Sequence, residues 1–176
     1  MQDILIHEAS DRNFSDIKFL MLTGLSEDPH AFSVSFDEYN YNSEGWWHSY
    51  IDPFTIGYSQ KMLIAEIESE AVGMIGVIFD SKKRKEHIAS IVWLYVLPKF
   101  RGLGVGKALM QSLLEQIQTD SKILKLSLLV NESQTSAINL YESFGFTESG
   151  RMKKELKIDD QFYDVLIMEK LINGAA

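Results

Sequence analysis

The sequence contains no cysteine, and this single absence excludes several kinds of chemistry. Disulfide bonds, thiolate zinc sites, iron–sulfur clusters and a cysteine nucleophile all require a thiol. Histidine is scarce as well: the four residues, His7, His30, His48 and His87, show neither an H-x-x-x-H spacing nor a neighbouring cluster of carboxylates. We therefore expect no metal site.

Long apolar segments are also absent. No stretch approaches the roughly 18 apolar residues that a membrane span requires. The N-terminal residues 1–8 show no basic segment followed by a long apolar one. These features predict a cytoplasmic protein with no membrane partner. With 176 residues and 45% hydrophobic content, the chain fits one globular domain over residues 1–176.

Positive charge is rare in the first part of the chain. Residues 1–70 carry three basic side chains against thirteen carboxylates, a formal charge of −10. The whole chain has a net charge of −8, so residues 71–176 sum to +2. No nucleic-acid partner is expected, because phosphate contacts need a basic face. The basic run at residues 82–85 lies between two expected strands, where a solvated hairpin tip is the favoured interpretation.

The spacing of apolar residues predicts an α/β (α+β) fold with a single mixed, mostly antiparallel central sheet flanked by helices. The expected order is β-α-α-β-β-β-α-β-α-β-β. Helices are expected at about residues 14–26, 43–52, 105–117 and 137–144, and strands at about 4–6, 62–66, 72–79, 88–96, 124–130, 147–157 and 162–169. Residues 32–42, between the first two helices, are expected to be irregular.

A glycine-rich segment, RGLGVGK at residues 101–107, lies between an expected strand end and an expected helix start. Glycine lets the backbone turn tightly and approach a ligand closely. Unpaired N–H groups at a helix start attract anions, and pyrophosphate is a common ligand of such a site. Arg101 and Lys107 add positive charge beside it. The segment therefore predicts a phosphate site.

Two familiar phosphate-binding motifs do not fit this segment. A Walker A loop ending at Gly106-Lys107 needs glycine at position 101 and Ser or Thr at 108, but the chain has Arg101 and Ala108. A dinucleotide fingerprint starting at Gly102 needs glycine at position 107, which is lysine. We therefore expect neither a P-loop nor a Rossmann-type site.

Two sequence blocks together resemble the GCN5-related N-acetyltransferase (GNAT) family. The first is R-x-x-G-x-G at 101–106, preceded by Val96-x-Pro98 at a strand end. The second, AINLYESFGF at 137–146, is similar to the A-I-x-L-Y-x-x-x-G-F run that follows the fifth strand in that family. The resemblance covers nearly the whole chain and is weakest over residues 27–60. Even there, the run 28–32 followed by Trp46-Trp47 resembles a bacterial subgroup of small acetyltransferases.

The resemblance implies the acyl-CoA N-acyltransferase fold and direct transfer of an acetyl group from acetyl-CoA to a primary amine of a small molecule or peptide. In the family, loop amides hold the pyrophosphate, and the edge of the fourth strand pairs with the pantetheine arm. A backbone N–H near Tyr95 or Val96 polarises the thioester carbonyl. The cofactor-binding residues expected on this basis are Leu94, Tyr95, Val96, Arg101, Gly102, Leu103, Gly104, Val105, Gly106, Lys107 and Gln134.

Tyr141 matches the tyrosine that many family members use to protonate the departing CoA thiolate, and it is the expected catalytic residue. A phenol is protonated at neutral pH and can donate. Tyr141 also lies on the apolar stripe of its helix, so a core role is the alternative.

Two positions depart from the family pattern. Gln134 stands where asparagine is frequent, and Ser90 stands where histone-modifying relatives place a catalytic glutamate. The route by which the amine loses its proton stays open between water, His87, a carboxylate of the acidic N-terminal part, and deprotonation before binding.

Phe32, Trp46 and Trp47 are the expected acceptor contacts, with helix core as the alternative role of the tryptophans. The first helices shape the acceptor cleft in this fold, and the −10 charge of residues 1–70 favours a cationic amine such as a polyamine. A homodimer is compatible with the resemblance, although no residue identifies its interface. The alternative function is a non-catalytic acyl-CoA-binding or regulatory module, which fits the missing glutamate but not the retained Tyr141.

Overall fold

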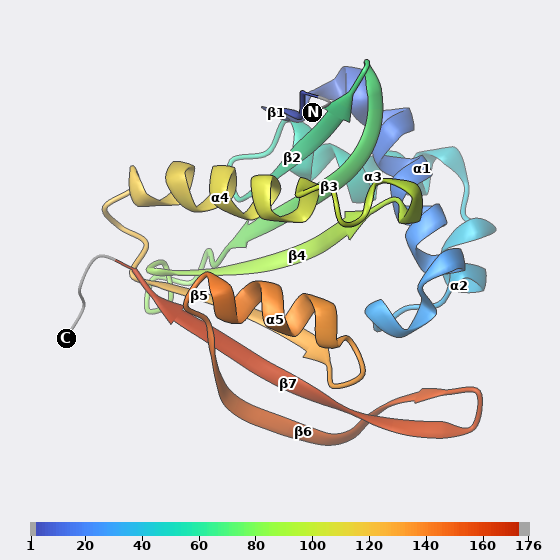
Figure 1. Ribbon diagram of the computed structural model, residues 1–176. Helices are drawn as coiled ribbons and strands as arrows, with labels where there is room; N and C mark the ends of the chain where they lie inside the picture. The colour runs from blue at the N-terminus through green and yellow to red at the C-terminus, as the bar shows by residue number, and fades with distance from the viewer. Residues whose placement is uncertain (1–2, 173–176) are drawn as a thin grey trace.

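Seven strands form one sheet in the computed structural model, which describes residues 3–172. The strand order is β1-β2-β3-β4-β5-β7-β6 (Figure 1). The strands are β1 (Leu5–Glu8), β2 (Gln60–Ile67), β3 (Glu70–Phe79), β4 (Ile88–Val96), β5 (Lys125–Asn131), β6 (Thr147–Ile158) and β7 (Gln161–Leu171). Neighbouring strands are antiparallel except β4 and β5, which run parallel because α4 connects them. The predicted mixed sheet is confirmed.

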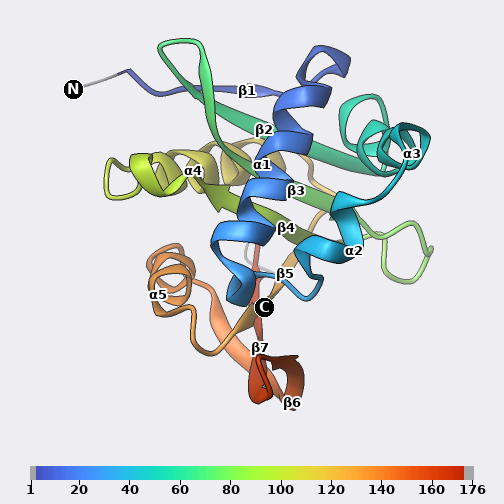
Figure 2. The same ribbon diagram turned by 90° about the vertical axis from the view of Figure 1, so that its right-hand side faces the viewer.

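Helices cover both faces of this sheet. They are α1 (Phe14–Glu27), α2 (Phe36–Asn40), α3 (Glu44–Thr55), α4 (Val105–Gln118) and α5 (Thr135–Ser143). The first three lie on one face, and α4 and α5 lie on the other (Figure 2). Among the described residues, no helix is long and apolar enough to cross a membrane.

Helix α4 lies where the spacing of apolar residues predicts a helix. Its apolar side chains recur every three or four residues and are buried against the sheet. Each fully buried Leu or Ile contributes about 1.5–3 kcal/mol relative to exposure. This packing fixes the start of α4, and therefore the glycine-rich segment, at the end of β4.

The prediction that residues 32–42 are irregular is wrong, because α2 lies within them. Ser35 accepts a hydrogen bond from the Glu38 N–H at 3.4 Å, and Glu38 accepts one from the Ser35 N–H at 2.6 Å. This reciprocal capping box stabilises a short helix start. The next helix also runs past its expected end: α3 continues through Pro53 to Thr55, with Phe54 buried in the core.

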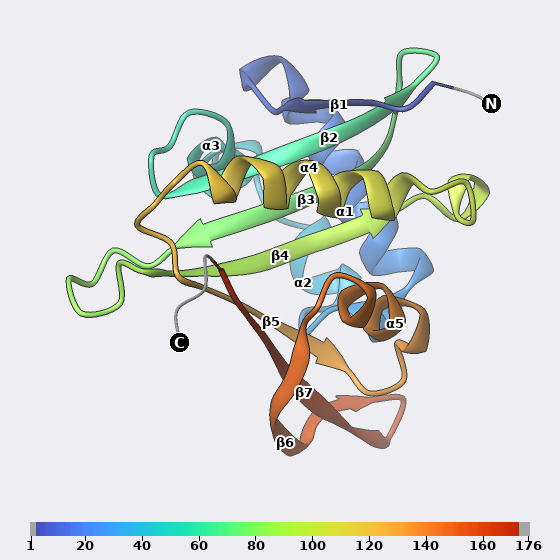
Figure 3. The same ribbon diagram turned by 60° about the vertical axis from the view of Figure 1, so that its left-hand side comes forward.

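Strands β4 and β5 pair over a short length only. Their register runs from Ile88 opposite Lys125 to Ser90 opposite Ser127, where the two serine hydroxyls are 3.2 Å apart. Beyond this point the strands diverge (Figure 3), while β4 continues alongside β3. The divergence opens the sheet next to the start of α4.

A bulge interrupts the pairing of β4 with β3 in the same region. Met74 lies opposite Tyr95, but Gly76 lies opposite Val92, so β4 has one extra residue. Trp93 takes a left-handed conformation there, with φ of 54°. A bulge leaves backbone groups outside the ladder and redirects neighbouring side chains.

Candidate active site

A cavity of about 650 Å³ lies where β4 and β5 diverge, and we call it the splay cavity. Its walls come from β4, the glycine-rich segment, β5 and α5, with a contribution from residues 28–31, which follow α1. Every predicted cofactor residue except Leu103 lines this cavity, as does Tyr141. Leu103 points to solvent and is 54% exposed. The lining residues are Asp28, Ala31, Leu94, Tyr95, Val96, Phe100, Arg101, Gly102, Gly104, Val105, Gly106, Lys107, Leu129, Val130, Gln134, Ser136, Ala137, Leu140 and Tyr141.

The glycine-rich segment adopts the backbone that its sequence predicted. Gly102 and Gly104 have φ of 76° and 91°, in the left-handed region that glycine adopts easily. A Cβ atom at either position would meet nothing within 4 Å. The open space beside them can therefore admit a ligand close to the backbone.

The first turn of α4 supplies the donors of this segment. Gly104 is the N-cap, and the first helical hydrogen bond joins the Ala108 N–H to the Gly104 carbonyl at 2.9 Å. The preceding amides of the turn have no partner within the helix. Together with the helix dipole, they make a site that favours an anion. Lys107 lines the same wall.

Arg101 is oriented by three contacts. Its Nε donates to the Val96 carbonyl oxygen at 2.9 Å, and its Nη2 lies 3.4 Å from Asp28 Oδ2. Its guanidinium also lies over the Tyr95 ring, 5.6 Å from the ring centroid. The Asp28 carboxylate accepts a second hydrogen bond from Gln134 Nε2 at 3.2 Å. Asp28 thus joins two predicted cofactor residues that are distant in sequence.

Tyr141 packs in the core and also lines the splay cavity. It is only 7% exposed, and its ring centroid lies 6.1 Å from that of Phe146. Burial raises the pKa of the Tyr141 hydroxyl well above its ordinary value. The phenol is therefore protonated throughout the neutral range and can donate a proton. Both interpretations drawn from the sequence, core packing and a place in the site, describe this residue.

Tyr95 was expected to contribute its backbone, and its side chain adds a feature that the sequence analysis missed. The residue is 3% exposed, and its hydroxyl has no hydrogen-bond partner within residues 3–172. Burial raises the pKa of this hydroxyl, with Arg101 acting in the opposite direction.

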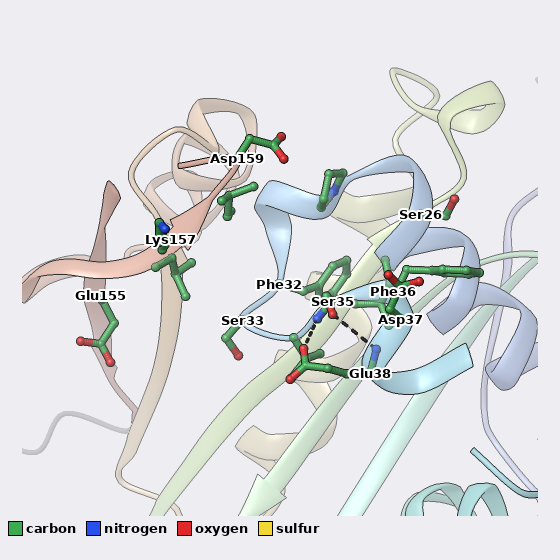
Figure 4. A pocket seen from close by; sticks show the side chains of 15 residues that line it. Ser26, Phe32, Ser33, Ser35, Phe36, Asp37, Glu38, Glu155, Lys157 and Asp159 are labelled. Carbon is green, nitrogen blue, oxygen red and sulfur yellow. Dashed lines mark hydrogen bonds between the residues drawn. The ribbon is translucent and has the colours of Figure 1, made fainter. Parts of the chain in front are cut away.

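A second cavity of about 620 Å³ lies between residues 25–38 and the tip of the β6–β7 hairpin, and we call it the hairpin cavity. Figure 4 shows Glu155 and Lys157 of the hairpin on one side, with Phe32 and Ser35 on the other. Its carboxylate-bearing lining residues are Asp37, Glu38, Glu155 and Asp159, against the single basic residue Lys157.

The three predicted acceptor residues are placed differently. Phe32 lines the hairpin cavity, and its ring centroid lies 4.9 Å from that of Trp93. Trp46 is half-buried and stacks on Tyr50 at 5.1 Å, outside the lining of both cavities. Trp47 is fully buried, so the prediction that it contacts an acceptor is wrong in this conformation. The core role is the one that its burial supports.

Neither Ser90 nor His87 lines either cavity. The Ser90 hydroxyl bonds to Ser127, and the His87 carbonyl accepts from the Leu124 and Lys125 amides at the edge of β5. His30 lines neither cavity, and its Nδ1 is buried without a partner in the described part of the chain. No group of three or more metal-ligating side chains occurs among residues 3–172.

Asp164 of β7 is held within the fold. It accepts a hydrogen bond from the Lys154 N–H at 2.8 Å, which lowers the pKa of its carboxyl. Arg151 Nη1 lies 3.4 Å from Asp164 Oδ2. Lys154 is in the left-handed region, at the irregularity between β6 and β7. Asp164 therefore supports the bend of the hairpin that closes the hairpin cavity.

Known proteins resemble this chain in sequence and in fold. The chain is 22% identical to the L-amino acid N-acetyltransferase AaaT of Escherichia coli, over 97% of this chain and 99% of that protein. A GNAT-family acetyltransferase structure from Streptococcus pneumoniae matches with a TM-score of 0.84 and 23% identity, covering 97% and 100% of the two chains. YncA of Salmonella typhimurium, a putative acetyltransferase solved with acetyl-CoA, matches with a TM-score of 0.78 and 16% identity, covering 99% and 96%.

A family model provides the decisive match. The model described as "Acetyltransferase (GNAT) family" matches residues 22–146, which extend from α1 through the glycine-rich segment to the end of the second sequence block. That range includes the residues that line the splay cavity. The chain therefore belongs to the GNAT acetyltransferase family.

Proposed function

We propose that this protein transfers an acetyl group from acetyl-CoA to a primary amine. The observation that carries the proposal is the splay cavity, which brings the glycine-rich segment, the free edge of β4 and Tyr141 together around one space. A strand edge, an anion site and a proton donor are three different parts of the expected chemistry, and they come from separate elements of the fold.

The residues of the splay cavity fit acetyl-CoA. The amides of the first α4 turn, with Arg101 and Lys107, would hold the pyrophosphate. Open space beside Gly102 and Gly104 supports close approach to the backbone. Residues 94–96 of β4, which β5 leaves unpaired, would bond to the pantetheine amides as an added strand. When bound, acetyl-CoA would supply the activated acetyl group and a thiolate leaving group.

The bulge in β4 would provide electrostatic stabilisation. Its extra residue interrupts the ladder with β3 between Val92 and Tyr95. Backbone N–H groups near Tyr95 or Val96 that face the cavity would donate to the thioester oxygen as negative charge develops on it. Fixed donors of this kind lower the barrier because they need little reorganisation.

Tyr141 would hold the proton that the leaving sulfur requires. Its burial keeps the hydroxyl protonated, and the residue lines the splay cavity. Burial and the neighbouring ring of Phe146, which follows α5, would hold the donor in place. The chemistry needs no covalent enzyme intermediate, which is compatible with a chain that lacks cysteine.

The acceptor amine would bind in the hairpin cavity. This cavity adjoins the splay cavity across the segment 28–32, because Asp28 and Ala31 line one cavity while Pro29 and Phe32 line the other. Its carboxylates outnumber its single lysine, and Lys157 is itself 2.7 Å from Asp160. The acidic lining favours a cationic acceptor, such as a polyamine or another amine with a second positive charge.

An amine panel tests this proposal. The enzyme is incubated with acetyl-CoA and polyamines, aminoglycosides, amino acids or peptides with free N-termini, and the release of free CoA thiol is followed. We expect release that depends on the amine and is fastest with cationic acceptors. Binding of acetyl-CoA without turnover on any amine would instead support the non-catalytic module.

A further inference from the structure

The segment 28–32 separates the two cavities, and its first residue makes contacts that the proposed chemistry does not use. Asp28 follows the end of α1 and faces the splay cavity, while Phe32, four residues later, faces the hairpin cavity. A carboxylate on the wall of a site for a polyanionic ligand requires an explanation, because its charge opposes binding.

The contacts of Asp28 show what its charge does in the free protein. One carboxylate oxygen lies 3.4 Å from Arg101 Nη2, and the other accepts from Gln134 Nε2 at 3.2 Å. The Asp28 side chain is 22% exposed, and that of Arg101 is 46% exposed. Both partners belong to the set that would bind the cofactor. Asp28 therefore occupies groups that a phosphate would need.

We propose that Asp28 is a positioning residue. Its carboxylate holds Arg101 in the free protein and so competes with a cofactor phosphate for the guanidinium. The inference rests on the proposed cofactor site. When the ligand binds, Arg101 exchanges the carboxylate for a phosphate, which offers it more charge and more acceptor oxygens. Asp28 then keeps only its bond to Gln134. Because the next residue, Pro29, lines the hairpin cavity, this exchange links cofactor binding to the acceptor side.

The size of the effect follows from the exposure of the pair. Ion pairs as exposed as this one are weak, so replacing the carboxylate should change ligand affinity by about two- to fivefold. Asp28→Asn is the informative change, because the amide keeps an oxygen for Gln134 while losing the charge that holds Arg101. Glu27→Gln is the matched control: it removes one carboxylate charge from the adjacent residue, which is exposed and lies outside both cavity linings.

The test measures binding of CoA by calorimetry, with thermal melting to show that each variant is folded. We expect Asp28→Asn to bind CoA about two- to fivefold more tightly than the wild type, and Glu27→Gln to bind like the wild type. Asp28→Ser, which also removes the charge, serves if the Asn variant fails to fold. Unchanged or weaker binding by the folded, charge-removing variant would overturn the inference.

A double-mutant cycle separates competition for Arg101 from simple repulsion. In an Arg101→Gln background there is no guanidinium to release, so adding Asp28→Asn should leave CoA affinity nearly unchanged. If Asp28→Asn raised CoA affinity equally in both backgrounds, competition for Arg101 would be overturned, and electrostatic repulsion between the carboxylate and the ligand would explain the effect. If the wild type itself binds no CoA, the proposed function fails, a result distinct from CoA binding that ignores Asp28.

Discussion

Tyr141 stands at the boundary between the core and the splay cavity, and its position explains how one side chain can serve both. Its ring packs against Phe146, which holds it in one orientation. The surrounding apolar atoms disfavour the phenolate and so keep the proton on oxygen. An apolar stripe on a helix is thus compatible with a chemical role when the stripe borders a cavity.

The raised pKa of Tyr141 predicts how the rate depends on pH. A free tyrosine has a pKa of about 10, so an unperturbed phenol would lose its proton, and its ability to donate, near that pH. Since burial raises the pKa of Tyr141, the hydroxyl stays protonated through that region, and kcat should show no descending limb there. The measurement is kcat between about pH 6 and 10 with both substrates saturating. A limb near pH 10 in the wild type that Tyr141→Phe lacks would contradict this assignment.

Single residues also show where sequence patterns are limited. Trp46 and Trp47 are adjacent on α3, yet one is half-buried beside Tyr50 and the other is completely buried. Helical geometry sends neighbouring side chains in different directions, and only the packing of α3 on the sheet decides which one is inside. The contact between Asp28 and Gln134 joins residues far apart in the chain, so no local pattern indicates it.

At the scale of elements, the turn between β4 and α4 supplies many of the residues of the proposed cofactor site. Gly104 combines a left-handed backbone with open space where a side chain would project. Gly145, after α5, has a similar φ of 83° but lies outside the lining of the splay cavity. The two glycines share a backbone requirement and differ in their surroundings.

This difference predicts distinct effects of alanine. Gly104→Ala and Gly145→Ala should each destabilise the fold by about 1–2 kcal/mol, because an L-residue is strained in the left-handed region. Only Gly104→Ala should also weaken CoA binding, by about tenfold, since its methyl group enters the phosphate space. Thermal melting and calorimetry with CoA measure the two effects separately. Equal loss of CoA affinity in both variants would mean that backbone strain alone is responsible.

Most elements could be predicted from the sequence because their apolar spacing is regular. The exceptions are short or broken elements. Helix α2 is too short for periodicity, and its signal was the S-x-x-E capping box at Ser35 and Glu38. Pro53 has no backbone N–H, so the last turn of α3 lacks one hydrogen bond. The burial of Phe54 in the core compensates for that loss. The insertion of β7 between β5 and β6 is a long-range pairing that no local pattern specifies.

At the scale of the whole molecule, the two cavities correspond to the uneven distribution of charge along the chain. The glycine-rich segment, proposed to bind phosphate, lies in the part with a charge of +2, and Asp37 and Glu38 of the hairpin cavity lie in the part with −10. The hairpin adds Glu155 and Asp159 from the other part of the chain, which the sequence split did not anticipate. The fold thus combines carboxylates from both parts around one cavity.

Neutralising that lining tests whether it selects the acceptor. Asp37→Asn combined with Glu38→Gln should raise KM for a cationic amine by roughly fivefold per charge removed, and leave KM for a neutral amine unchanged. Glutamine at position 38 keeps an oxygen for the α2 cap. Glu115→Gln on α4, outside both cavities, is the control. If KM for the cationic amine does not change, the acidic residues act only as a solvated surface.

The most direct test of the central claim compares the wild type with Tyr141→Phe, using CoA thiol release with the best amine and calorimetry with CoA. If Tyr141 protonates the leaving sulfur in the splay cavity, the variant should bind CoA normally while kcat falls about 100-fold. An unchanged kcat in a folded variant would contradict the account.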